Sequence, residues 1–389
     1  MQLGWIDFSK EERNKIMQTL KLLEESTAVD ELGIGVIRDG YSDILFPGIT
    51  TLQTRAKYFV LIPYIFTEAE KESFKRSTEV LQWINKKEDM LVRTLVKNSD
   101  ADAKGIIGSQ LYKQGKSVKL KPSSIYWNGL KTFEIIKDKN LSVGNVCDIV
   151  FGKSTRRRAI TIKKEGETYD DETAVNENIV VFSPIHLDYS MENDTNIELT
   201  KLEASYLSEK ITTASGSRNS LLAYMLNKHL IFPSFDKIDY IDLPDVIKYH
   251  YCLAKSFADF IRGAHIRYNV IFSNGKDIEQ VKAYYDWVKN FHFDGFNLSR
   301  VLSPVSSNDQ ETNTFLNTFY DASKKGDLEA VDRLIIGREK RIKQDRAKLR
   351  KPQEYFYDQP VHDYNLDYRY STAFYIIKDI FRGLEVRDG

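Results

Sequence analysis

The sequence predicts a mainly α-helical protein, with a helix-turn-helix-like N-terminal half, a small β element and a helical C-terminal half. Three observations favour this fold class. Apolar residues recur at helical spacing along most of the chain. Capping boxes at Ser9–Glu12 and Thr200–Glu203 mark helix starts, because hydroxyl and carboxylate can each accept a backbone N–H of the first turn. Short β-type runs occur between residues 145 and 187.

These patterns divide the chain into a helical, helix-turn-helix-like domain (1–140), a β-containing wing or linker (141–198) and a helical domain (199–389). The length of 389 residues fits roughly two or three domains. Lys and Arg (56) balance Asp and Glu (56), so a nucleic-acid partner would have to be met by local basic patches. Two cysteines, no secretory signal and no long apolar run lead us to expect a cytoplasmic protein without a membrane segment.

The stretch 30–66 is predicted to form two helices separated by a Phe-Pro-Gly stop. One of two adjacent threonines after the stop would cap the second helix. Its first two turns would carry Arg55 and Lys57, whose charges suit contact with phosphates. On the polar face of the first helix, Arg38 and Asp39 are expected to form an internal ion pair or to position Arg55.

Residues 104–137 predict a second helix-turn-helix-like unit: a short helix near 106–112, a lysine-rich connection and a helix capped by Ser123 or Ser124. Three lysines lead into this last helix and two aromatic residues lie in it, which suits phosphate contact and base stacking. These residues are Lys116, Lys119, Lys121, Tyr126 and Trp127. In the alternative interpretation the aromatic residues, with Phe133, are core and the lysines are merely solvated.

Between residues 145 and 187, β-type runs separated by charge predict a β-wing or a strand-bearing linker. The triplet Arg156, Arg157 and Arg158 would lie at the tip of such a wing, where it can reach phosphates. Alternatively, the triplet is solvated or paired with the acidic run at 165–172.

Helical periodicity dominates the remaining stretches. Pro63, inside an apolar run, is expected to kink or break a helix. After Pro352, an aromatic-rich segment is expected to pack on the body of the protein. The other predicted helices are 68–97, 202–211, 220–230, 243–272, 278–291, 328–350 with a cationic face, and 370–384.

No complete catalytic constellation is found in the sequence, so we assign no catalytic residue, no metal ligand and no cofactor. A magnesium-dependent nuclease needs carboxylates and a lysine that converge on strands, and Asp148, Lys163 and Glu165 match such a set loosely. Ile162 stands where that set needs an acid. A phosphate-binding loop around Gly115-Lys116-Ser117 would need a glycine where this chain has Gln110.

Four stretches together resemble a bacterial family of unknown function. They are GWIDFSKEER at 4–13, DELGIGVIRDGYSDILFPGITTLQTRAKYF at 30–59, GIIG with PSSIYWNGL between 105 and 130, and NLDYRYSTAFYIIKDIFRGL at 365–384. The resemblance implies a cytoplasmic protein encoded in anti-phage defence islands, near a helicase fused to a phospholipase D-like nuclease domain. Where the family usually has Arg-x-Arg-Tyr-Phe, this chain has Lys57, which keeps the charge but loses the planar fork. Residues 140–200 match poorly, and no catalytic residue is carried over.

We therefore expect a non-catalytic subunit of an anti-phage defence system that binds DNA or docks a helicase–nuclease partner. In the DNA-binding hypothesis the contacts come from Arg55, Lys57, Lys116, Lys119, Lys121, Tyr126, Trp127, Arg156, Arg157 and Arg158. The alternatives are a protein-interaction regulator without DNA contact and a divergent metal-dependent nuclease.

Overall fold

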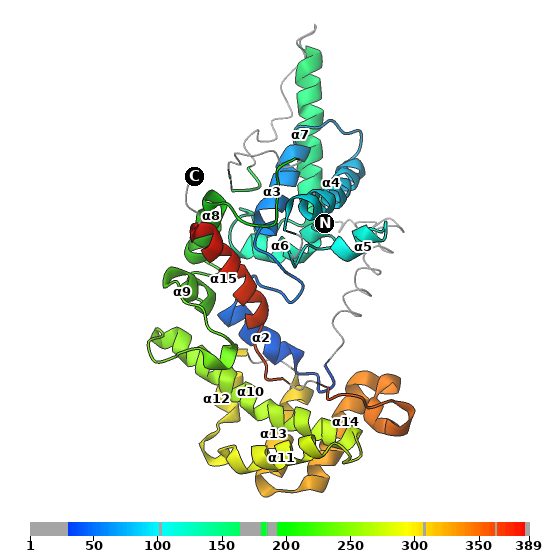
Figure 1. The fold of residues 1–389 in the computed structure, drawn as a ribbon, viewed down its shortest axis with the longest axis vertical. Helices are drawn as coiled ribbons and strands as arrows, with labels where there is room; N and C mark the ends of the chain where they lie inside the picture. Colours follow the sequence, from blue (N-terminus) through cyan, green and yellow to red (C-terminus); the bar gives the residue numbers. More distant parts are fainter. Residues whose placement is uncertain are drawn as a thin grey trace, which may run out of the picture. The chain divides into compact units, whose positions relative to one another are not determined.

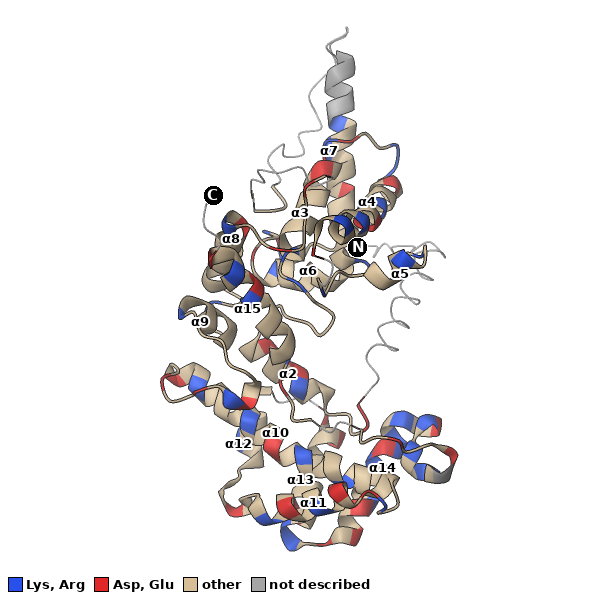
Figure 2. Ribbon diagram, viewed as in Figure 1, with Lys and Arg blue, Asp and Glu red and all other residues tan. Residues whose placement is uncertain are grey.

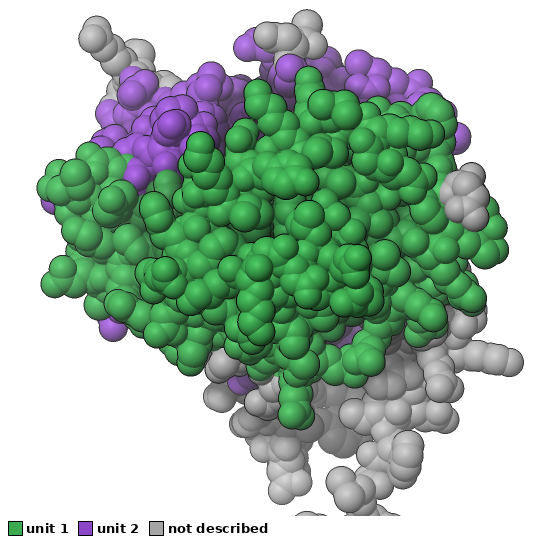
Figure 3. All heavy atoms as spheres, turned by 90° about the horizontal axis from the view of Figure 1, so that it is seen from below, with its two compact units in different colours: residues 1–44, 239–368 green, residues 45–238, 369–389 purple. Residues whose placement is uncertain are grey.

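The computed structural model shows a mainly α-helical protein, as the sequence predicts (Figure 1). It describes residues 30–100, 103–163, 180–183, 185, 193–305, 309–361 and 364–385, with the backbone alone for residues 157–163 and 353. The predicted capping box at Ser9–Glu12 lies outside these residues. Contacts group the chain into two compact units, coloured separately in Figure 3. Unit 1 comprises residues 1–44 and 239–368, and unit 2 comprises residues 45–238 and 369–389.

Unit 1 is built around the 28-residue helix α10 (Asp245–Phe272), against which α11, α12 and α14 pack. The approach of α11 depends on Gly263, because a Cβ atom there would lie 2.3 Å from the Trp287 ring. The hydroxyl of Tyr41 in α2 donates to the carbonyl of Val301 and ties α2 to this unit. The helices beside α10 are α2 (Gly35–Leu45), α11 (Ile278–Asn290), α12 (Leu298–Leu302), α13 (Gln310–Lys325) and α14 (Leu328–Lys343). Short 3-10 turns are η2 (Phe293–Gly295), η3 (Ser303–Val305), η4 (Gln344–Arg346), η5 (Lys348–Arg350) and η6 (Pro352–Glu354).

Unit 2 is built around α3 (Tyr58–Ala69), which is buried along most of its length and packs against α4 and α6. At the other side of unit 2, α15 (Tyr370–Glu385) packs along α8 (Lys201–Thr213) and α9 (Leu221–Asn227). The remaining helices are α4 (Ser77–Asn98), α5 (Ser109–Lys113), α6 (Pro122–Thr132), α7 (Val143–Lys163) and η1 (Phe235–Lys237). Acidic and basic residues are interspersed along the helices of both units (Figure 2).

Two expectations for the stretch 30–66 are wrong. The second helix begins at Tyr58 and not after the threonines, so Arg55 and Lys57 precede the helix instead of lying in it. A break at Pro63 is not found either, because α3 continues through this residue to Ala69; a helix loses only one backbone hydrogen bond at a proline.

The predicted β-wing is also wrong over most of its length, because residues 143–163 form the helix α7. Val146 and Val150, which suggested strand, lie four residues apart and are both fully buried, so they belong to one helical face. Among the described residues, β pairing is limited to an isolated antiparallel bridge between Ile136 and Phe182. The triplet at 156–158 therefore lies on a helix, and the side chains of its last two members are outside the described part.

The C-terminal prediction agrees with the structure more closely. The capping box of α8 forms as expected: the Thr200 hydroxyl accepts from the Glu203 amide, and the Glu203 carboxylate accepts from the Thr200 amide at 2.8 Å. The cationic helix expected at 328–350 is helical to Lys343 and continues in 3-10 turns. Its Arg338 is buried and donates to the carbonyl of Leu32 at 2.8 Å, so this part of the basic face is internal.

Candidate functional site: a buried junction of ion pairs

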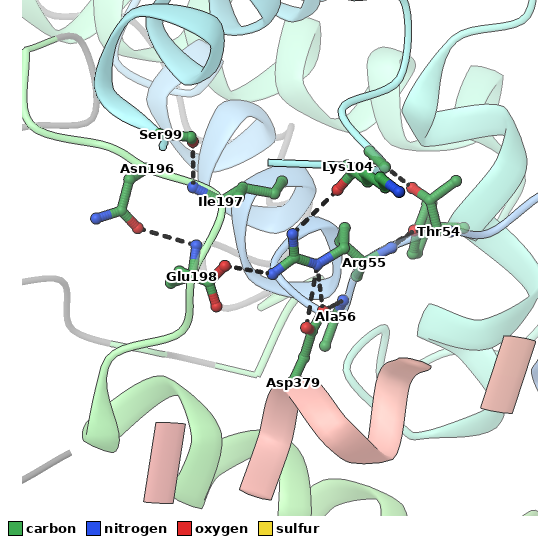
Figure 4. A network of polar contacts seen from close by, with 11 residues as sticks. Thr54, Arg55, Ala56, Ser99, Lys104, Asn196, Ile197, Glu198 and Asp379 are labelled. Carbon is green, nitrogen blue, oxygen red and sulfur yellow. Dashed lines mark hydrogen bonds and ion pairs between the residues drawn. The ribbon is translucent and has the colours of Figure 1, made fainter. Parts of the chain in front are cut away.

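Arg55 lies at the centre of a polar network inside unit 2 (Figure 4). Its Nε donates to both carboxylate oxygens of Asp379, at 3.0 and 2.8 Å. Nη2 donates to Oε1 of Glu198 at 2.7 Å, and Nη1 donates to the carbonyl of Lys104 at 3.1 Å. The side chain is 9% exposed. The planar guanidinium group of Arg55 therefore donates its hydrogen bonds to internal acceptors from three distant parts of the sequence.

The loop that carries Arg55 is held by groups from other elements. The Tyr126 hydroxyl accepts from the amides of Thr54 and Arg55, at 2.8 and 3.1 Å, and donates to the Arg55 carbonyl at 2.9 Å. The amide of Ala56 donates to Oδ2 of Asp379 at 2.9 Å. These contacts satisfy the backbone before α3, which explains why the helix starts late. Gly105 faces the arginine with φ +85°, and a Cβ there would lie 2.9 Å from Arg55 Cγ.

A second buried pair joins Lys57 to α8. The Nζ of Lys57 lies 2.6 Å from Oε2 of Glu203, and both side chains are at most 2% exposed. The same oxygen accepts from the Thr200 amide, so Glu203 serves the helix cap and the ion pair together. Burial lowers the pKa of Lys57, and the nearby Glu203 carboxylate opposes that shift.

The three ion pairs of Arg55 and Lys57 make one junction of two cations and three carboxylates, which joins the loop before α3 to the start of α8 and to α15. The segment with Glu198 is itself anchored, because the Ile197 amide donates to Ser99 Oγ at 3.0 Å. Burial raises the pKa of Asp379, and the hydrogen bonds from Arg55 oppose this shift. Each charged group faces a partner within hydrogen-bond distance, so the arrangement is suited to fixing three segments and not to bond-breaking chemistry.

The structure also places the other expected DNA-contacting residues. Lys121 pairs with Asp89 at 2.5 Å, whereas Lys116 and Lys119 are exposed. Tyr126 is fully buried and Trp127 is 7% exposed, with its Nε1 donating to the Leu141 carbonyl at 2.9 Å. The two aromatic residues are therefore core, as the alternative interpretation had it. Because α6 is buried along most of its length, it offers little surface for reading a groove in DNA.

Arg38 and Asp39 form a local ion pair, with Nε of Arg38 3.2 Å from Oδ1 of Asp39 and both side chains partly exposed. Arg156 is half-buried in α7, and Arg157 and Arg158 have side chains outside the described part.

The nuclease alternative requires Asp148, Lys163 and Glu165 to converge, and the structure does not support this for Asp148 and Lys163. Asp148 and Lys163 lie on the same helix, α7, fifteen residues apart. At about 1.5 Å per residue this separates their backbones by about 22 Å, too far apart for the two positions to belong to one metal site. Asp148 instead accepts from the hydroxyl of Ser77. Glu165 lies outside the described residues, within which no group of three His, Cys, Asp or Glu side chains is arranged for a metal ion.

Two of the three carboxylates of the junction, Asp379 and Glu198, were missed in the sequence, although a signal was present for Asp379. Asp379 lies among Ile376, Ile377 and Ile380 in a helix whose apolar face is buried. A carboxylate on an apolar face needs a buried partner, which makes such a residue a marker for an internal ion pair. Glu198 carries no comparable signal, because it lies in a loop.

Glu88 is a further buried carboxylate in unit 2 that bears the same signal, four residues after Ile84 on the buried face of α4. Its Oε1 accepts from the amide of Ser123 at 2.7 Å and its Oε2 accepts from the Ser123 hydroxyl at 3.2 Å. Glu88 thus caps α6 from a neighbouring helix. Burial raises the pKa of Glu88 to about 7, against the opposing effect of the hydrogen bonds from Ser123.

We expect Glu88→Gln to stabilise unit 2 at alkaline pH. The native state binds more protons than the unfolded state between the ordinary pKa of 4.5 and about 7, so the contribution of Glu88 falls as pH rises through this window. The full effect is up to about 3 kcal/mol. Glutamine keeps the acceptor for the Ser123 amide without the buried charge. Thermal unfolding near about pH 5 and about pH 8 measures the difference.

Glu88→Ala is the control, because it leaves the Ser123 amide without its acceptor and should lower stability at both pH values. If the glutamine variant is less stable than the native protein at alkaline pH, the charge of Glu88 stabilises the start of α6 and the inferred sign is wrong.

A family model matches the N-terminal part of the chain. Residues 1–146 match the model of a family of unknown function (DUF6361). No curated protein and no solved structure matches the chain. Within the described part, no helix combines the length and the apolar character that a bilayer crossing requires.

Proposed function

We propose that this protein is a non-catalytic docking subunit that binds a protein partner, a helicase–nuclease in an anti-phage defence system. The defence setting is supported by the resemblance described above. The choice of docking over DNA binding is supported by the ion pairs of three expected DNA contacts. Arg55, Lys57 and Lys121, which would have neutralised phosphates, instead pair with carboxylates.

The observation that carries the proposal is the exposure of Phe356 in unit 1. Its side chain is 86% exposed, whereas the next residue is anchored: the Tyr357 hydroxyl donates to Asp277 at 2.5 Å and its ring packs on Phe272. The amide of Val361 also donates to the side chain of Asn269, at 2.8 Å. A large apolar side chain presented on an anchored segment loses little entropy on binding, as protein-interface hot spots require.

We expect Phe356→Ala to weaken binding of the co-expressed helicase–nuclease by roughly tenfold or more, as for an interface hot spot. Co-purification through a tag on this chain, with nuclease treatment of the lysate, followed by titration of the purified partner, measures this. Tyr375→Ala is the matched control, because Tyr375 is an exposed aromatic residue of unit 2. Equal affinity of the Phe356 variant, or loss of the complex on nuclease treatment, would contradict the proposal.

The second candidate is direct DNA contact, favoured by the exposure of Lys116 and Lys119 before α6. Fluorescence anisotropy with duplex and single-stranded DNA at about 50 mM salt tests it, since phosphate contacts predict affinity that falls steeply with salt. Binding that shows this salt dependence and is lost in Lys116→Glu/Lys119→Glu would favour this candidate over docking.

A further inference from the structure

A groove of about 680 Å³ lies between α3 and α4 in unit 2. Ile65 of α3 and Met90 and Leu91 of α4 provide apolar side chains to its lining, beside the rings of Tyr64 and Trp83. Met90 is 47% exposed. The groove shares no residue with the ion-pair junction or with the Phe356 segment.

One face of α4 runs along the whole groove. Trp83, Lys87, Met90, Thr94 and Lys97 all line it, and they follow one another at alternating intervals of four and three residues. This is the spacing of a single helical face. From the first to the last of them the helix rises about 21 Å, so the groove suits a rod-like ligand better than a compact one.

The acidic and basic side chains that line the groove are unequal in number. Its α3 side provides Glu68 and Glu72, but Lys71 lies 2.5 Å from Glu68 and offsets one of these charges. The α4 side provides three cations. They are Lys87, Arg93 and Lys97. Lys87 already lies over the Trp83 ring, so Arg93 and Lys97 account for the positive surplus, which favours a partner with acidic side chains next to α4.

Protein fits this groove better than nucleic acid. The ammonium group of Lys87 lies 5.1 Å from the centre of the Trp83 ring, so a cation already covers a face on which a base would stack. Glu72 would repel a phosphate backbone. Exposed methionine on an apolar floor suits the irregular side chains of an amphipathic helix, which docks through residues spaced three and four apart.

We propose that the groove between α3 and α4 binds an acidic amphipathic helix of a protein partner. The helix lays its apolar stripe on Met90 and beside the rings of Tyr64 and Trp83, and its carboxylates face Arg93 and Lys97. This inference rests on the docking function proposed above and assigns a second contact surface, on the other unit.

The probe is a fluorescein-labelled synthetic helix of about 16 residues, with leucines at helical spacing flanked by glutamates. A scrambled peptide of the same composition and a single-stranded oligo-dT are the comparison ligands. The groove variants are Met90→Glu and Arg93→Glu/Lys97→Glu. Lys113→Glu, at an exposed lysine of α5, is the matched control. Anisotropy titrations give the affinities, and thermal unfolding confirms that each variant is folded.

We expect the helical peptide to bind the native protein, Lys113→Glu and Phe356→Ala alike, and both groove variants to bind at least about tenfold more weakly. Normal binding in Phe356→Ala separates the groove from the first surface. The inference is overturned if the native protein does not bind the helix, if the scrambled peptide binds equally, if the groove variants bind normally, or if oligo-dT competes at the same site.

Discussion

Asp379→Ala should lower the free energy of unfolding of unit 2 by about 3–5 kcal/mol, the usual cost of removing one partner from a buried ion pair. The variant leaves the Arg55 guanidinium buried, with only the partly exposed Glu198 carboxylate, the nearer of whose oxygens lies 2.7 Å away, as an ion-pair partner. It also removes the acceptor for the Ala56 amide. Because two compact units need not unfold together, hydrogen exchange in α8 and α15 is the appropriate measurement.

Two further variants make this test specific. Lys71→Ala breaks an exposed pair and should change stability by less than about 1 kcal/mol. Arg55→Met in the Asp379→Ala background removes the stranded charge and should recover part of the loss. A cost for Asp379→Ala that is no larger than that of Lys71→Ala would show that the junction does not stabilise unit 2.

The helical class could be predicted because it depends on local patterns. The start of α8 at Thr200 needs only a hydroxyl and a glutamate three residues apart, and the structure has that cap. The start of α3 was predicted too early in the sequence, and the reason for the difference is non-local. Its preceding amides are satisfied by Tyr126 and Asp379, which lie about seventy and more than three hundred residues away in the chain.

The roles of the charged residues were harder to predict than the helices. The residues next to Arg55 and Lys57 in the sequence would suit contact with phosphates and pairing with internal carboxylates equally well. The local sequence therefore does not distinguish these two roles. One of the partners of Arg55 and Lys57 does: Asp379 lies on an apolar helical face, where an isolated charge would be costly. Where a sequence places a carboxylate on the apolar face of a helix, a basic residue elsewhere in the chain should therefore be considered as its ion-pair partner before it is assigned to a ligand.

Three of the four stretches that carry the family resemblance meet at the junction. Arg55 belongs to the block 30–59, Gly105 opens GIIG, Tyr126 lies in PSSIYWNGL and Asp379 lies in the closing helix. Phe356 and the lining of the groove beside α4, the two surfaces proposed to bind a partner, lie outside those stretches.

Glu203→Gln should destabilise unit 2 by about 3–5 kcal/mol, because Lys57 keeps its buried charge and loses the carboxylate 2.6 Å away. Glutamine still offers an oxygen to the Thr200 amide, so the loss reports mainly on the ion pair. Thr200→Ala is the matched control, since it removes the hydroxyl cap of α8 alone and should cost about 1 kcal/mol.

The pH dependence of Glu203→Gln separates the ion pair from general damage to α8. Without the carboxylate, the pKa of Lys57 falls further below its ordinary value of 10.5. Between that lowered pKa and 10.5 the unfolded state binds more protons than the native state, so the stability of the variant rises with pH. The deficit of Glu203→Gln should therefore shrink as pH is raised toward the ordinary lysine pKa, while the deficit of Thr200→Ala stays constant. A parallel pH profile for the two variants would mean that Glu203 acts through the cap and that the buried charge of Lys57 does not depend on it.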